Sequence, residues 1–166
     1  MVIEKIGNLL KEDVFVVAHQ TNCRGVMGAG IAKQIKNNIL PKNEYFKYVT
    51  ACNEKGAELL GQIQILEGFK YLVINCFGED VPTGYKQDTD YDALHSALLK
   101  TKEFVEKSNV SIGFPGLMGC GLAGGDWNIV RKMIYDIFSD IPQKVVICYF
   151  DPAEFAKYNP DVKGNL

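Results

Sequence analysis

The residues best suited to chemistry lie in one glycine-rich stretch, residues 18–32, with the sequence Ala-His-Gln-Thr-Asn-Cys-Arg-Gly-Val-Met-Gly-Ala-Gly-Ile-Ala. It begins at the end of an apolar run, residues 14–18, that is typical of a buried strand. It passes through Gly25, Gly28 and Gly30 and then enters a segment with apolar residues at helical spacing. Such a loop can bind an anion, because glycine lets a ligand approach the outward-pointing N–H groups at a helix start. The same glycines could also serve only to shape a tight turn.

A second glycine-rich loop, residues 117–125, follows a predicted strand and precedes a predicted helix. Its residues Gly119, Gly121 and Gly124 match the G-x-G-x-x-G dinucleotide fingerprint, which makes a nicotinamide-dependent oxidoreductase one candidate. Asp151, at the end of the next strand, would then be the acid that binds ribose. Against this, the fingerprint normally opens a doubly wound domain, whereas only one strand follows here, and Asp151 comes later than the motif requires.

A cysteine hydrolase is another candidate. Cys120 precedes a helix start, which can lower the pKa of a thiol, and His19 could serve as its base. The two residues are far apart in the sequence, and no sequence feature brings them together. His95 lies within an amphipathic helix and is expected to be a surface or packing residue.

Strands and helices must alternate to position these two loops. The apolar patterns predict strands over residues 2–6, 14–18, 62–66, 71–77, 111–114 and 144–150, with a hairpin turn near Gly68. They predict helices over residues 28–37, from Pro41 to Gly56, after a capping box at residues 89–92, and after an N-cap at Asp126. Asn37 and Asn38 are expected to loosen the chain, and residues 151–166 to form a short helix or turn.

This alternation predicts a single α/β domain over residues 1–166, with three α/β/α layers around a mixed central sheet. Ligands of such sheets bind beyond the carboxyl ends of the strands, so we expect both loops to line one site. The long polar loop over residues 78–88 is a further candidate for a functional segment.

Composition and charge narrow the possible partners. The chain has 166 residues, 47% of them hydrophobic, and a net charge of −2, with Arg24 and Arg131 as its two arginines. No clustered basic stripe is present, which argues against a surface for duplex nucleic acid. Because bidentate arginine clamps are scarce, backbone N–H groups would have to hold any phosphate.

The five cysteines, an odd number without a C-x-x-C pair, argue against a disulfide framework and a zinc site. Cys76 and Cys148 lie in apolar runs and are expected to be buried thiols. No apolar run is long enough to span a bilayer and no secretory signal is visible, so we expect no membrane association and a cytoplasmic location.

Four motifs taken together resemble the macrodomain family. They are residues 18–32, then Phe77-Gly78, then Thr89-Asp-Tyr-Asp-Ala93, then Gly119-Cys-Gly-Leu-Ala-Gly-Gly-Asp-Trp127. The chain is most similar to the branch that contains bacterial and phage ADP-ribose phosphate-processing proteins and the terminal ADP-ribose protein glycohydrolases. The resemblance extends from about residue 5 to residue 150.

The resemblance implies that ADP-ribose, free or attached to a macromolecule, binds across the top of the sheet without a further cofactor or metal. It places Asn22 at the distal ribose and Gly28, Ala29, Gly30 and Ile31 around that ribose and the neighbouring phosphate. Gly119, Cys120, Gly121 and Leu122 would hold the diphosphate through backbone N–H groups. Asn8, at the position of a usual Asp, would contact the adenine amino group, and Phe77 would pack near the distal ribose.

Departures from the family pattern bear on mechanism. The lysine and aspartate used by the terminal glycohydrolases are missing, which argues against a covalent lysine mechanism; Lys86 could substitute or could be an ordinary solvated lysine. Close relatives often carry Gln and Arg where this chain has Glu79 and Gln87, so its pocket mouth is less basic.

Two functions follow from the resemblance. As an ADP-ribosyl hydrolase or ADP-ribose 1″-phosphate phosphatase, the protein would hold a water near the anomeric carbon with Asn22, the glycine loop and a substrate phosphate. His19 would be the nearby side chain with a suitable ordinary pKa, although its position before Asn22 could instead direct it into the core. Asp126 would act as a cap and not as an acid. Alternatively, the protein would be a non-catalytic reader that binds ADP-ribosylated partners.

Overall fold

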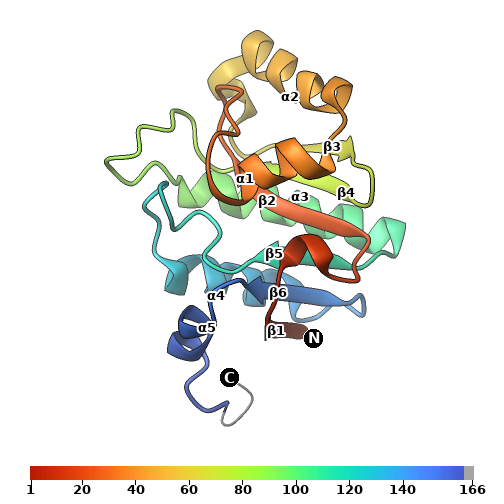
Figure 1. Cartoon of the computed structure of the whole chain (residues 1–166), viewed down its shortest axis with the longest axis vertical. Coiled ribbons are helices and arrows are strands. Elements are labelled where there is room, and N and C mark those ends of the chain that lie inside the picture. Colours follow the sequence, from red (N-terminus) through yellow and green to blue (C-terminus); the bar gives the residue numbers. More distant parts are fainter. Residues whose placement is uncertain (163–166) are drawn as a thin grey trace.

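In the computed structural model, which describes residues 1–162, one six-stranded sheet is covered by helices on both faces (Figure 1). The strand order is β1-β6-β5-β2-β4-β3. The strands are β1 (Val2–Ile6), β2 (Val16–Thr21), β3 (Ile63–Glu67), β4 (Leu72–Phe77), β5 (Ile112–Pro115) and β6 (Val145–Tyr149). The α-helices are α1 (Gly30–Gln34), α2 (Lys42–Lys55), α3 (Tyr91–Ser108), α4 (Trp127–Phe138) and α5 (Pro152–Tyr158).

The predicted three-layer α/β/α architecture with a mixed sheet is confirmed. One apolar core packs α3 and α4 against the sheet, and a second packs α1 and α2 against the opposite face. Five strands are parallel, and β3 pairs antiparallel with β4 in the predicted hairpin, where the Gly68 N–H donates to the Tyr71 carbonyl. The carboxyl ends of the five parallel strands therefore meet at one edge of the sheet, where ligands of such folds bind. No helix in the described part of the chain could span a membrane.

Strand β2 differs from its prediction in a way that matters for the site. It begins at Val16 and continues to Thr21, because its ladder with β4 runs from Val16 opposite Leu72 to Thr21 opposite Phe77. His19, Gln20 and Thr21 are thus strand residues and not loop residues. Successive side chains of a strand point to opposite faces, so His19 and Thr21 share one face and Gln20 lies on the other.

The helix predicted over residues 28–37 is divided. α1 ends at Gln34, and a π-helical turn, η2 (Ile35–Ile39), continues the coil, with the Leu40 N–H donating to the Ile35 carbonyl at 2.9 Å. The predicted loosening at Asn37 and Asn38 is wrong, because both residues belong to this turn. Ile35 and Ile39 are buried, and their packing holds the wider turn in place.

Helix caps are partly as predicted. Asp126 caps α4 as expected, accepting from the Asn128 N–H at 2.9 Å, and Gly56 ends α2 with a φ of 50°. The capping box at residues 89–92 is wrong: Asp90 caps α3 by accepting from the Ala93 N–H at 3.0 Å. The Thr89 hydroxyl does not cap the helix and instead donates to the Gly119 carbonyl.

Candidate ligand-binding site

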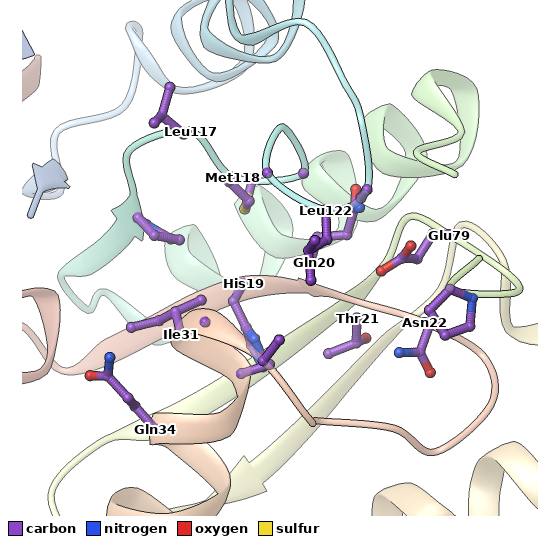
Figure 2. Close-up of a pocket in the computed structure, with 18 of the residues that line it drawn as sticks. His19, Gln20, Thr21, Asn22, Ile31, Gln34, Glu79, Leu117, Met118 and Leu122 are labelled. Atoms are coloured by element: carbon purple, nitrogen blue, oxygen red, sulfur yellow. The ribbon is translucent and has the colours of Figure 1, made fainter. Parts of the chain in front are cut away.

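A cavity of about 690 Å³ opens at the carboxyl edge of the parallel strands. Both glycine-rich loops line it, as predicted, together with the end of β2 and the loop after β4 (Figure 2). Its lining includes residues 7–9, 19–22, 28–32, 115–119 and 121–123, with Glu79, Asp88 and Phe150. This volume is within the range of pockets that bind small molecules and cofactors.

The two loops offer backbone donors to this cavity. Gly28 and Ala29 in the first loop, and Gly121 and Leu122 in the second, have N–H groups that donate to no other residue of the described chain. The conformation of the second loop depends on Gly119, which has a φ of 75° and whose carbonyl accepts from the Gly125 N–H at 2.9 Å. Backbone N–H groups of this kind can hold phosphate without arginine.

The floor of the cavity contains buried polar atoms without partners. The Nδ1 of His19, the Oε1 of Gln20 and the Oγ1 of Thr21 make no hydrogen bond within the described structure. His19 and Thr21 are 0% and 3% exposed. In Figure 2 both side chains point to the side of β2 on which α1 lies, whereas Gln20 points to the second loop. Buried polar atoms normally have partners, so these atoms, on the two faces of β2, are candidates for completion by a ligand or a water.

The tautomer of His19 is decided by a chain of hydrogen bonds that ends at a backbone carbonyl. The Gln64 side-chain amide donates to the Lys47 carbonyl at 3.2 Å, and a carbonyl can only accept, so the Oε1 of Gln64 faces Asn75. The Nδ2 of Asn75 donates to that Oε1 at 3.3 Å, which leaves the Oδ1 of Asn75 facing His19 Nε2 at 2.8 Å. Nε2 therefore carries the proton, and Nδ1 keeps a buried lone pair without a partner in the described structure.

The ordinary pKa expected of His19 is contradicted, and the alternative, that its position directs it into the core, is borne out. Its catalytic role remains a prediction. Complete burial lowers its pKa to about 4, although the hydrogen bond with Asn75 opposes this shift. His19 is therefore neutral at pH 7 and a weak base. In this tautomer Nδ1 can only accept a hydrogen bond.

A short relay of hydrogen bonds connects β2, the segment just before α3 and the second loop. The Nε2 of Gln20 donates to the Thr89 hydroxyl at 2.9 Å, and that hydroxyl donates to the Gly119 carbonyl at 2.6 Å. The Gln20 side chain runs tightly along Gly78, where an added Cβ would lie 2.3 Å from its Oε1. Neither Gln20 nor Thr89 was predicted to belong to the site; the signal is the alternation of β2 and its pairing, which tertiary contacts reveal.

Asn22 lines the cavity, but its side chain mainly holds the first loop. Its Nδ2 donates to the Val26 carbonyl at 2.7 Å, and its Oδ1 accepts from the Arg24 N–H and the Tyr48 hydroxyl at 3.0 and 2.9 Å. Asn22 thus positions the loop around the ligand. Its contact with the distal ribose remains a prediction.

The profile of the Macro domain family matches residues 18–134 of the chain. The chain belongs to this family. The match includes residues 18–21 of β2, both glycine-rich loops and most of α4, and so spans most of the cavity lining of this macrodomain.

Relatives of this macrodomain include proteins whose names refer to ADP-ribose or to the hydrolysis of ADP-ribosyl groups. It is 26% identical over 151 residues to a DNA ADP-ribosyl glycohydrolase of Mycobacterium tuberculosis, in an alignment covering 86% of this chain and 40% of that protein. The macrodomain of Mycobacterium tuberculosis DarG has the same fold, with a TM-score of 0.74 and 24% identity over 90% of this chain and 97% of that one. Thermosipho africanus DarTG, solved in complex with ADP-ribose, has a TM-score of 0.71 and 21% identity over 86% of this chain and 40% of that one. The chain thus spans about 40% of the length of the curated relatives it matches.

Most of the residues that the family resemblance implied lie on the cavity. They are Asn8, Asn22, Gly28, Ala29, Gly30, Ile31, Gly119, Gly121 and Leu122. The Oδ1 of Asn8 already accepts from the Leu10 N–H at 2.9 Å, and its second lone pair can still accept from a ligand. Ligand contact by these residues remains a prediction.

Phe77 and Cys120 do not line the cavity, contrary to expectation. Phe77 is fully buried and stacks on Tyr48 with 6.1 Å between ring centroids, because the alternation of β4 directs it to the core under α2. The Cys120 N–H is already bonded to the Leu117 carbonyl, and its thiol donates to the Met118 carbonyl at 3.3 Å. Burial raises the pKa of Cys120 to about 12, with Asp126 adding to the shift, so the thiolate of the cysteine-hydrolase alternative is disfavoured.

The remaining predicted residues are placed as follows. Asp151 caps α5 by accepting from the Ala153 N–H at 2.9 Å and is absent from the cavity, which removes the ribose contact of the oxidoreductase alternative. Lys86 and Gln87 are exposed and outside the cavity lining, and His95 is exposed on α3, as predicted. Cys76 and Cys148 are buried thiols, also as predicted. Within residues 1–162 no cluster of His, Cys, Asp and Glu could hold a metal ion.

Proposed function

We propose that this macrodomain binds ADP-ribose in the cavity and hydrolyses the bond between the distal ribose and an attached group. The observation that carries the proposal is the convergence of two glycine-rich loops on a floor with unpartnered polar atoms in one cavity of about 690 Å³. Phosphate needs backbone donors, which the loops supply, and ribose hydroxyls need acceptors, which the floor supplies.

The proposed pose places the adenine near Asn8 and Phe150, the diphosphate along the second loop, and the distal ribose between the first loop and Thr21. His19 Nδ1 and Thr21 Oγ1 lie on one face of β2, where each can bond a water or a ribose hydroxyl. Asn22, close to them, holds the first loop in the shape that encloses the ribose. His19 and Asn22 would thus be positioning groups for the reaction.

The names of the relatives support the substrate class. A DNA ADP-ribosyl glycohydrolase and a structure with ADP-ribose are among the proteins similar to this chain. We propose that the substrate is ADP-ribose attached to a macromolecule or to phosphate.

The test is calorimetric titration with ADP-ribose, with NAD and AMP as controls, followed by turnover assays. The assays use ADP-ribosylated single-stranded DNA, an ADP-ribosylated protein and ADP-ribose 1″-phosphate. We expect ADP-ribose to bind more tightly than either control and at least one adduct to be cleaved. Binding without turnover of any adduct would instead establish a reader, and preference for NAD would favour an oxidoreductase.

The role of the floor is tested by Thr21→Val, which keeps the shape of the side chain and removes Oγ1. We expect turnover to fall about fivefold while ADP-ribose still binds, because one hydrogen bond contributes about 1 kcal/mol. Thr50→Val, at an exposed position of α2, is the matched control. Unchanged turnover in Thr21→Val would remove Thr21 from the mechanism.

A further inference from the structure

Glu79 is a carboxylate held on the wall of the cavity by a well-supported backbone. It follows Gly78 after β4, and its backbone forms a β-bridge with Thr89, next to the N-cap of α3. Its carbonyl accepts from the Cys23 thiol at 3.3 Å. Figure 2 shows the carboxylate beside the carboxyl end of β2, beyond which Asn22 follows. This is the end of the cavity to which the proposed function assigns the distal ribose.

The Glu79 carboxylate has no hydrogen bond or ion pair with any residue in the range 1–162. The cation on the neighbouring loop, Arg24, is committed elsewhere: its Nε and Nη2 bond both carboxylate oxygens of Asp80, at 2.9 and 3.0 Å. A partly buried carboxylate without a partner costs stability, and proteins retain such groups chiefly at functional sites.

The charged and titratable groups around Glu79 favour its neutral form. Asp88, across the loop, is itself ionised and bonded to the Thr83 hydroxyl and the Gly84 N–H at 2.6 and 2.9 Å. Cys23 and His19, on the adjoining segments, are neutral at pH 7, because burial raises the pKa of Cys23 to about 12 and lowers that of His19 to about 4. Burial, with the charge of Asp88 in addition, raises the pKa of Glu79 to about 7.

A group with this proton affinity exchanges protons readily near neutral pH, which general acid–base catalysis requires. Neutral His19, by contrast, is a weak base and removes a proton from water poorly. The two residues lie on different elements, His19 on β2 and Glu79 on the loop after β4. The proton of the attacking water must therefore pass to a residue other than His19.

We propose that Glu79 is the catalytic base of the hydrolysis, an inference that rests on the proposed function. The oxygen of the held water bonds to the anomeric carbon of the distal ribose. The bond from that carbon to the departing atom breaks, and its electron pair stays on the departing atom. Glu79 takes one proton from the water and then passes it to the departing group, so the enzyme returns to its starting state.

The test compares wild type with Glu79→Gln, which keeps the size of the side chain and removes its basicity. We expect kcat to fall about 10²-fold or more, while ADP-ribose binding is not weakened, because a negative charge beside an anionic ligand is removed. Wild-type kcat should rise with pH through about 7, where Glu79 loses its proton, and Glu79→Gln should lack this rise. Glu106→Gln, at an exposed position of α3, is the matched control.

Asp88→Asn gives a graded second test. It removes the negative charge that helps to keep Glu79 protonated, so the rise in kcat should move to lower pH. Wild-type kcat and pH dependence in Glu79→Gln would overturn the role of Glu79 and leave the proposed function intact. Failure of the wild-type protein to bind ADP-ribose, or to cleave any adduct, would overturn the proposed function and the role of Glu79 with it.

Discussion

Two buried polar regions of this macrodomain differ in how completely their hydrogen bonds are made. In the first region, on the terminal strand β1, the Glu4 carboxylate accepts from Arg131 and Tyr135 of α4, at 3.0 and 2.6 Å, and from Tyr149 of β6. Asn159, after α5, also donates to it at 3.4 Å. At the cavity floor, in contrast, His19, Gln20 and Thr21 each keep an atom without a partner among residues 1–162.

The contrast distinguishes polar groups that hold the fold together from polar groups that a ligand would complete. Burial alone would raise the pKa of Glu4, but the hydrogen bonds from Arg131, Tyr135 and Tyr149 outweigh it, so the pKa is lowered and the carboxylate stays charged. This cluster joins three elements and is complete without a ligand. The floor is incomplete, and buried groups of this kind are retained where a ligand supplies the missing bonds.

The largest effect is expected from breaking the complete cluster. Arg131→Met leaves Glu4, whose side chain is 4% exposed, without its cation. We expect the free energy of unfolding, measured by urea denaturation, to fall by about 3 kcal/mol, because a buried charge without its partner is costly. Lys132→Met breaks an exposed pair with Asp136 and should change stability by less than about 1 kcal/mol. Equal losses of unfolding free energy in the two variants would show that the Glu4 cluster stabilises the fold no more than an exposed ion pair does.

The pH dependence of stability should separate the two regions. His19 has a folded pKa of about 4 against an ordinary value of 6.5, so the unfolded chain takes up its proton first as pH falls. Stability should therefore drop by roughly 3 kcal/mol between pH 6.5 and 4. Glu4 has a lowered pKa, so its contribution is lost at more acid pH, below its ordinary value of 4.5.

Denaturation of wild type and His19→Gln across this range measures the effect. Glutamine does not titrate and can still donate to Asn75, so the variant should be nearly flat between pH 6.5 and 4 apart from the contribution of other groups. A wild-type slope that persists unchanged in His19→Gln would contradict the buried neutral state of His19.

A smaller effect is expected from Gly78→Ala. The added Cβ would lie 2.3 Å from the Oε1 of Gln20, which must then leave its place beside Thr89 and Gly119. We expect a stability loss of about 1–3 kcal/mol, together with weaker ADP-ribose binding, because overpacking displaces the relay that holds the second loop. In the background of Gln20→Ala the clash disappears, so adding Gly78→Ala there should cost little. An equal cost in both backgrounds would show that Gln20 is not the obstacle.

Local patterns in the sequence determined much of this architecture. Apolar alternation located all six strands, and Asp126 and Gly56 marked helix ends correctly, because caps and periodicity act over a few neighbouring residues. The glycine loops were placed at the carboxyl edge of the sheet because parallel topology follows from strand–helix alternation. The family resemblance, confirmed by the match over residues 18–134, added the expected ligand.

Only the tertiary structure decided what the individual side chains can do. The tautomer of His19 depends on a chain of partners that ends at Lys47, and the release of Thr89 from capping depends on Gly119, 30 residues away in the sequence. The elements that pack beside them direct Phe77 to the core and leave the Glu79 carboxylate without a partner in the described part of the chain. Hydrogen-bond satisfaction and pKa are properties of the assembled surroundings, and those surroundings come from segments far apart in the chain.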